Sequence, residues 1–294
     1  MSEMEIIAQT VLLSLTVAAL YAAVASGLTL EFGVTRIVNF AHGEFVMLGA
    51  FTTYFLYTKF GVPPLIGMIV AALAMGALSY LVFRGFLCRV IKQDEHNQIL
   101  ATLGLSILLL NLAIIWWSPD ARSMNAPQLL PTLRFGGITI PGNNVLLLVV
   151  GGLLYAALSA FMNLTRYGVQ LRLASDDPEL AVYSGIDVDS MFALSFVIGG
   201  MTAGLAGGLV AETLYVQPSI GVDFVVRAFA IVALGGLGSI PGALLGAALL
   251  SEAEGLTSTF APHGGSWGYG VAFLALVIVL LIRPTGLFGR EMRS

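Results

Sequence analysis

Residues 27–50 read GLTLEFGVTRIVNFAHGEFVMLGA, an apolar stretch interrupted by charged and polar side chains. The interrupting residues are Glu31, Arg36, Asn39, His42 and Glu44. A charged side chain at the centre of a bilayer costs about 2.5 to 3.5 kcal/mol, so these groups are expected to face other protein or a water-filled cavity. Gly27, Gly33 and Gly43 lie in the same stretch and favour a helix that breaks and restarts. The stretch therefore predicts a broken membrane helix beside a passage for something polar.

The composition of the 294-residue chain is that of a membrane protein. Hydrophobic residues make up 57% of it and charged residues 10%, whereas soluble domains contain about 25% charged residues. Apolar runs of about 17 to 25 residues, long enough to cross a bilayer, recur along the chain. No polar block is large enough to fold separately, so we predict one transmembrane domain over residues 1–294. The formal net charge of −4 argues against a nucleic-acid partner.

The apolar runs predict an all-α, polytopic helix bundle of about eight membrane segments, some of them broken or re-entrant. The expected segments are 6–30, 44–60, 64–83, 98–117, 144–164, 190–214, 224–250 and 267–283. Cations gather in residues 84–97, in residues 165–190 and after residue 282, which indicates a cytoplasmic position for these three parts. The longer stretch 118–144 carries fewer cations for its length and fits the outer face.

Three full crossings after residue 190 would place Arg283, Arg290 and Arg293 outside, so one segment is expected not to cross. The best candidate is 224–250, because GGLGSIPG at 235–242 divides it into two halves. Pro241 suits the first turn of a new helix, with Ser239 as its cap. We therefore predict a re-entrant hairpin, with its irregular backbone buried in protein or reached by water.

Residues 165–189, TRYGVQLRLASDDPELAVYSGIDVD, are expected to lie on the cytoplasmic side. Asp176 or Asp177 can cap a short helix whose first turn contains Pro178, and Gly185 can end it. A solvated linker is the alternative. The length and partial apolarity of the segment instead favour a docking element for a cytoplasmic partner.

Small residues at four-residue spacing occur in the runs 200–208, 238–246 and 152–160. This spacing lets helix backbones approach closely, and we expect packing within the chain rather than a subunit interface. Glu212, Asp223, Arg227, Glu252 and Glu254 lie near the ends of predicted spans, where long side chains reach the interface.

The sequence has no GxxxxGK[ST] loop, so any coupling to ATP must come from a partner. Its three histidines are not in metal-ligand spacing, so we predict that the chain is not an enzyme and binds no metal or cofactor itself.

Three strings, GVTRIVNFAHGEFVMLGA, RYGVQLRLASDDPELAVYSGIDVD and ALGGLGSIPGALLGAALL, closely resemble the permeases of bacterial branched-chain amino acid ABC importers, the LivH type. The resemblance spans nearly the whole chain. It implies an inner-membrane complex with a second homologous permease subunit, two cytoplasmic ATP-binding subunits and an extracytoplasmic solute-binding protein. The chain would form half of the pathway for a small amino acid or amide, and its carboxyl terminus would be cytoplasmic.

The resemblance also places site residues. Those near the substrate pathway would be Arg36, Asn39, His42, Glu44, Gly238, Ser239 and Pro241. Residues 165–189 match the coupling loop of the family, which implies that an ATPase contacts Arg172, Ala174, Asp176, Asp177, Pro178, Glu179, Ala181, Gly185 and Asp187.

Several alternatives stay open at this point. The solute could be urea, a short amide or another amino acid. The polar set at 31–44 could instead pair internally or reach the interface. An autonomous ion-coupled carrier or channel would also use such a set. A membrane-embedded enzyme based on His42 and Glu44 lacks a third oriented group at credible spacing.

Overall fold

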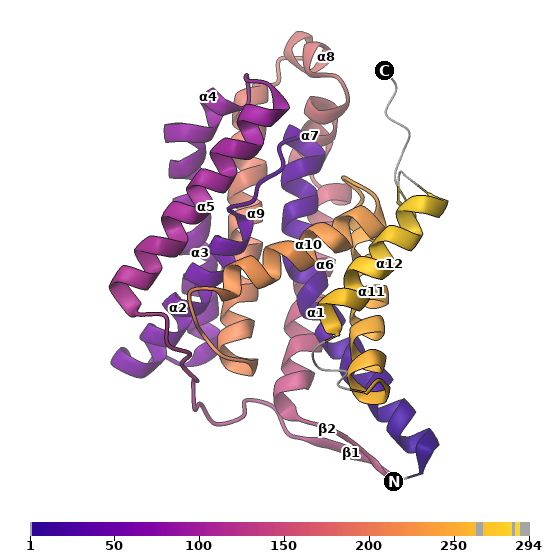
Figure 1. Cartoon of the computed structure of the whole chain (residues 1–294). Coiled ribbons are helices and arrows are strands. Elements are labelled where there is room, and N and C mark those ends of the chain that lie inside the picture. Colours follow the sequence, from indigo (N-terminus) through magenta and orange to yellow (C-terminus); the bar gives the residue numbers. More distant parts are fainter. Residues whose placement is uncertain (1, 263–266, 284–285, 289–294) are drawn as a thin grey trace.

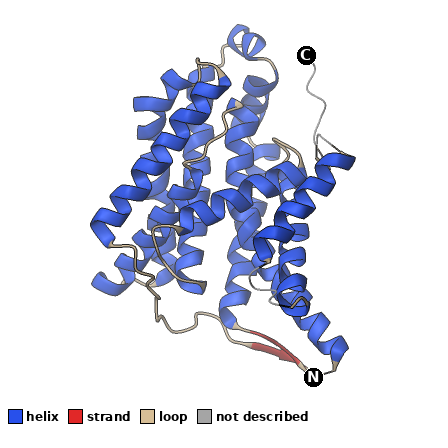
Figure 2. Cartoon of the chain, in the orientation of Figure 1, coloured by secondary structure: helices blue, strands red, loops and turns tan. Residues whose placement is uncertain are grey.

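The computed structural model describes residues 2–262, 267–283 and 286–288, and in these residues the chain is a bundle of helices with one short strand pair (Figures 1 and 2). The predicted all-α membrane bundle is confirmed. Arg290 and Arg293, which helped to orient the sequence, lie outside the described residues.

The helices are α1 (Glu3–Thr35), α2 (His42–Phe60), α3 (Pro64–Val82), the π-turn η1 (Phe83–Leu87), α4 (Cys88–Val90), α5 (Glu95–Trp117), α6 (Gly142–Leu164), α7 (Arg166–Asp176), α8 (Pro178–Tyr183), α9 (Val188–Thr213), α10 (Ile220–Gly235), α11 (Ile240–Phe260) and α12 (Gly268–Ile282). The antiparallel strands are β1 (Leu133–Phe135) and β2 (Ile138–Ile140), with Leu133 opposite Ile140.

Among the described residues, 5 helices are long and apolar enough to cross a membrane, namely α1, Pro64–Val90, α5, α6 and α9. The bent pair of α10 and α11 raises this number to 6. The expected count of about eight is therefore not reached by length and apolarity alone. The span predicted at 64–83 was too short, because the helix continues through the π-turn to Val90.

The centre of the bundle is formed by α1 and α9. In each of them 72% of the most apolar stretch is buried, against 17% in α5 and 28% in α6. α5 and α6 present apolar side chains outward, as expected for contact with lipid.

Glycines allow the central helices to approach one another. A Cβ built on Gly204 would lie 2.5 Å from the Ala71 carbonyl oxygen of α3, and one on Gly246 would lie 2.5 Å from the Ile231 carbonyl oxygen of α10. Packing within the chain is thus confirmed for these two runs. Gly152, in the third run, has nothing within 4 Å of its Cβ position.

The two ends of the bundle carry different connections (Figure 1). One end holds the strand hairpin and the start of α1, and the opposite end holds α4, α7 and α8. The loops predicted at 84–97 and 165–190 therefore share an end, and residues 118–144 lie at the other, as expected. α12 leads from the hairpin end back toward the α8 end.

Candidate functional site

The first interruption lies between α1 and α2, at residues 36–41. The break predicted within residues 27–50 is therefore present, but it does not fall at Gly27 or Gly33, because α1 continues as a helix through both to Thr35. Gly27 instead lies against α9, where a Cβ would overlap the hydroxyl of Thr202. α1 ends at Arg36, which adopts a left-handed conformation with φ 57° and donates its N–H to the Phe32 carbonyl at 2.8 Å.

A buried polar network holds this interruption against α1. Glu31 is 1% exposed, and its two carboxylate oxygens contact Asn39 Nδ2 at 2.8 Å and His42 Nδ1 at 3.1 Å. The other ring nitrogen of His42, Nε2, lies 3.1 Å from the Val24 carbonyl oxygen. Because a carbonyl only accepts, Nε2 is the donor in this contact, and Nδ1 faces the Glu31 carboxylate.

The network decides between two interpretations of the polar set. Glu31, Asn39 and His42 satisfy one another within the chain, which is the internal pairing left open by the sequence. Arg36 is exposed and does not join them. In this conformation the predicted pathway residues Asn39 and His42 are buried, at 1% and 0% exposure.

Glu44 belongs to a separate contact, with α5. It is fully buried, and its Oε1 accepts a hydrogen bond from Ser106 Oγ at 3.0 Å. One turn earlier on α5, Thr102 Oγ1 donates to the Val38 carbonyl of the interruption at 2.9 Å. Two hydroxyls therefore fasten the outlying helix α5 to this region. Since His42 and Glu44 have different partners, they do not form a catalytic pair.

The second interruption separates α10 from α11 at residues 236–239. The two helices are bent by 115° at this point, a geometry shared by a broken span and by the predicted re-entrant segment. Gly236 and Gly238 adopt φ values of 103° and 80°, which L side chains rarely adopt. Ser239 Oγ accepts from the Gly242 amide at 3.1 Å, so the predicted cap is confirmed.

Residues after α12 complete the end of α10. The amides of Leu287 and Phe288 donate to the carbonyls of Leu234 and Gly235, each at 2.9 Å. The last carbonyls of a helix have no partner within the helix and need donors from elsewhere. No side-chain pattern predicts this contact, because it uses only backbone atoms.

The two interruptions meet at a pair of glycines. A Cβ built on Gly33, in the last turn of α1, would lie 3.0 Å from the Cα of Gly238. The structure thereby brings the predicted pathway residues Gly238, Ser239 and Pro241 close to the end of α1. They lie beside Gly33 rather than in the Glu31 network.

The predicted short helix in residues 165–189 is present as α8. Asp177 Oδ1 accepts from the Leu180 amide at 2.9 Å, and Pro178 stands in the first turn. Gly185 follows with φ 77°, and the Ile186 amide donates to the Ala181 carbonyl at 2.9 Å, which closes the helix end. The preceding helix α7 was not predicted as a separate element.

Asp187 begins α9. Its carboxylate accepts hydrogen bonds from the hydroxyl and the amide of Ser190, and these bonds hold the pKa of Asp187 below its ordinary value. The Asp187 carboxylate is therefore charged at neutral pH, at an exposed position next to α8.

The candidate coupling residues divide into two groups. Exposed residues, available to a partner, are Arg172, Asp176, Asp177, Pro178, Glu179, Gly185 and Asp187. Ala174 and Ala181 are fully buried, so they pack α7 and α8 onto the bundle and do not offer a surface.

α7 packs against the helix ends beside both interruptions. Ser175 Oγ donates to the Gly33 carbonyl in the last turn of α1. Leu171 is fully buried in an apolar cluster with Leu30 and Val34 of α1, and Ile240, the first residue of α11, packs against the same cluster. α7 therefore contacts the end of α1 before the first break and shares a cluster with the start of α11 after the second.

A further polar cluster joins α1, α10 and α11 in the opposite half of the bundle. The Glu254 carboxylate accepts from Tyr21 Oη at 2.7 Å and from Arg227 Nε at 3.1 Å. Arg227 and Glu254, expected to have a structural role near span ends, pair with each other within the protein at 19% and 14% side-chain exposure.

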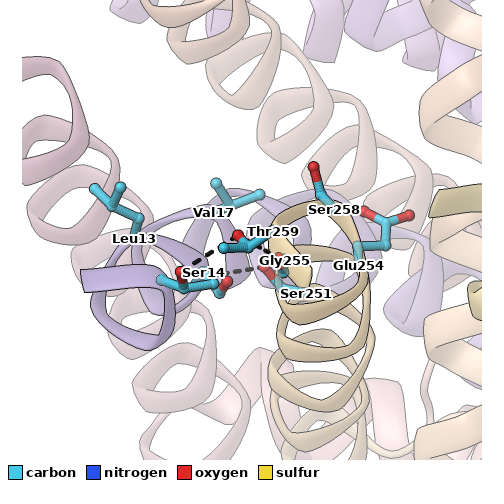
Figure 3. Close-up of a pocket in the computed structure, with 9 residues that line it drawn as sticks. Leu13, Ser14, Val17, Ser251, Glu254, Gly255, Ser258 and Thr259 are labelled. Carbon is cyan, nitrogen blue, oxygen red and sulfur yellow. Dashed lines mark hydrogen bonds between the residues drawn. The ribbon is translucent and has the colours of Figure 1, made fainter. Parts of the chain in front are cut away.

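Glu254 also lines a pocket of about 310 Å³ between α1 and α11. Figure 3 shows its other walls, which carry mainly hydroxyl groups and short apolar side chains. Ser251 Oγ donates to the Ser14 carbonyl at 2.7 Å across the crossing of the two helices. These hydroxyl groups hydrogen-bond α1 to α11 where the two helices cross.

Helices of membrane-spanning length, two interruptions of these helices and an exposed helical segment packed against the adjoining helix ends are the features of an integral membrane permease. The chain belongs to the family described as "Branched-chain amino acid transport system / permease component", whose model matches residues 10–280.

Two relatives show the extent of the similarity. The chain is 33% identical over 291 residues to the high-affinity branched-chain amino acid transport system permease protein BraD of Pseudomonas aeruginosa, with 94% of both chains covered. It is 30% identical to the corresponding protein LivH of Escherichia coli K12, covering 94% of this chain and 93% of that protein.

The fold also resembles a solved structure, PsaBC from Streptococcus pneumoniae in complex with a Fab. The TM-score is 0.52 at 16% sequence identity, with 95% of this chain and 92% of that chain covered. At this identity the likeness concerns the fold alone.

Proposed function

We propose that this permease carries branched-chain amino acids into the cell as half of the membrane pathway of an ATP-driven importer. The observation that carries the proposal is the 33% identity to BraD over 94% of both chains. The complete complex would contain a second homologous permease, two ATP-binding subunits and an extracytoplasmic binding protein. This chain would bind neither ATP nor a cofactor.

The exposed face of α7 and α8 is the proposed contact with an ATPase. It combines Arg172 with the acidic residues Asp176, Asp177, Glu179 and Asp187, a mixed-charge surface that suits a polar protein partner. With this face in the cytoplasm of a bacterial inner membrane, the cations at Arg84, Arg89 and Lys92 also lie inside, in agreement with the positive-inside rule.

Closure of the ATPases would move α7, and the contacts of Ser175 and Leu171 would pass this movement to the two interruptions. The pathway would then change its opening near Gly238, Ser239 and Pro241, whereas the network of Glu31, Asn39 and His42 would keep the first interruption rigid. Helix shifts of this kind are common in switching membrane proteins.

The test is uptake into vesicles that contain the complete complex. We expect ATP-dependent accumulation of radiolabelled leucine, isoleucine or valine, and none when the ATPases are omitted. Urea and acetamide serve as competing solutes. Accumulation without the ATPases would contradict the proposal of an ATP-driven importer. Competition by urea but not by unlabelled leucine would contradict the proposal that the solute is a branched-chain amino acid.

A further inference from the structure

A groove runs between α3 with its π-turn and α5, on the outside of the bundle. Its volume is about 450 Å³. Every residue of its lining is apolar or glycine: Leu81, Val82, Gly85, Phe86, Leu100, Ala101, Gly104, Leu105 and Leu108. Because α5 is largely exposed and held mainly by the hydroxyls of Thr102 and Ser106, the groove stays open along its flank.

Two glycines make the groove hollow. A Cβ built on Gly85 or on Gly104 would meet nothing within 4 Å. Their φ angles are also not in the left-handed region, so neither close packing nor backbone conformation within the chain requires glycine here. Gly85 lies in the π-turn, an irregularity frequently found at functional sites.

A cation stands at one mouth of the groove. The guanidinium of Arg89 donates to the carbonyl of Gly85, which lines the groove. Arg84 and Lys92 are exposed on the same segment. Nearby acidic residues include Asp94, directly before α5, and Glu95, which shares its helix face with Ile99 and Thr102 rather than with the groove residues. Asp187 is close to Arg84, which also donates to Ser190 of α9.

We propose that this groove binds an anionic phospholipid. One acyl chain would lie along the apolar lining, and the phosphate would accept hydrogen bonds from Arg89, with Arg84 and Lys92 adding positive charge. Basic clusters beside grooves between membrane helices recognise anionic lipid headgroups. A helix of a partner would cover the apolar lining equally well, but it would leave the guanidinium of Arg89 without an anion.

The test measures lipid retained by the full-length chain after purification in mild detergent, by native mass spectrometry with phosphatidylglycerol and phosphatidylcholine supplied equally. Gly104→Leu fills the groove. Gly152→Leu is the matched control, because Gly152 is also exposed on a membrane helix with nothing within 4 Å of its Cβ position. Arg89→Gln removes the headgroup contact.

We expect phosphatidylglycerol retention to fall about fivefold in Arg89→Gln, as for the loss of one cation near an anionic surface, and to fall at least as much in Gly104→Leu. Gly152→Leu should retain lipid as the wild type does. Equal retention in Gly104→Leu and Gly152→Leu would overturn the proposal, as would equal loss of both lipids in Arg89→Gln. A second protein chain bound in place of lipid, and released by Gly104→Leu, would identify a helix as the occupant and also overturn it.

Discussion

Gly33, in the last turn of α1, packs against Gly238, in the interruption between α10 and α11. A Cβ added to Gly33 would lie 3.0 Å from the Cα of Gly238. At Gly238 the backbone itself favours glycine, because φ is 80° there. Gly33 is helical, so only this close contact calls for a glycine at that position.

Gly33→Ala is therefore expected to impair leucine uptake and to destabilise the protein. Overpacking costs about 1 to 3 kcal/mol, although alanine is otherwise favoured over glycine in a helix by roughly 0.5 to 1 kcal/mol. Thermal unfolding in detergent and vesicle uptake measure the two effects. Gly152→Ala, in open space on α6, should be neutral or slightly stabilising. Equal behaviour of the two variants would show that the contact has no importance.

Ser175→Ala removes the side-chain donor to the Gly33 carbonyl. We expect ATP-dependent uptake to fall by up to about fivefold, in keeping with a net hydrogen-bond contribution of about 1 kcal/mol. Membrane insertion and ATPase binding should be unchanged. Ser184→Ala, on an exposed residue after α8, is the control. A drop in ATPase binding in Ser175→Ala would indicate a surface role instead of transmission.

Gly185→Pro should uncouple the transporter. Proline fixes φ near −65°, whereas Gly185 has φ 77°, so the end of α8 must rearrange. Co-purification of the ATPases and stimulated ATP hydrolysis measure the outcome. Gly136→Pro imposes a comparable change at φ 59° in the hairpin at the opposite end. If both variants lose ATPase binding equally, the loss reflects general misfolding and the assignment of the segment fails.

His42→Ala leaves the buried Glu31 carboxylate with Asn39 Nδ2 but without its contact to the imidazole. Breaking a buried pair costs about 3 to 5 kcal/mol, so we expect a large loss of stability. The double variant Glu31→Gln/His42→Ala should be less destabilised than the two single variants would suggest, by about 0.5 to 3 kcal/mol. Thermal unfolding of all four proteins gives this coupling. Strict additivity would mean that the contact of Glu31 with His42 contributes nothing.

The sequence could predict features that depend on local rules. The cap at Ser239, the helix begun by Asp177 and Pro178, and the break at 235–242 all follow from side chains within a few residues of each other. The alternation of apolar runs and cationic loops likewise predicted which connections share an end of the bundle.

Features that depend on distant neighbours could not be predicted. A glycine in an apolar run permits either a break or a close helix contact. At Gly27 it permits a close contact, because Thr202 of α9 occupies the space that a Cβ would need. The pairing of Arg227 with Glu254 required the 115° bend that brings α10 and α11 together. When Arg227 and Glu254 are considered one at a time, each is expected to extend toward the membrane–water interface.

The backbone contact of Leu287 and Phe288 with the last carbonyls of α10 has a consequence for biogenesis. These amides follow α12 in the sequence, so they leave the ribosome after every membrane helix described here. Until then the carbonyls of Leu234 and Gly235 lack these donors at membrane depth, which is costly. The end of α10 is therefore completed only after α12 has been made, and a nascent chain stalled at α12 should still expose this region to the translocon.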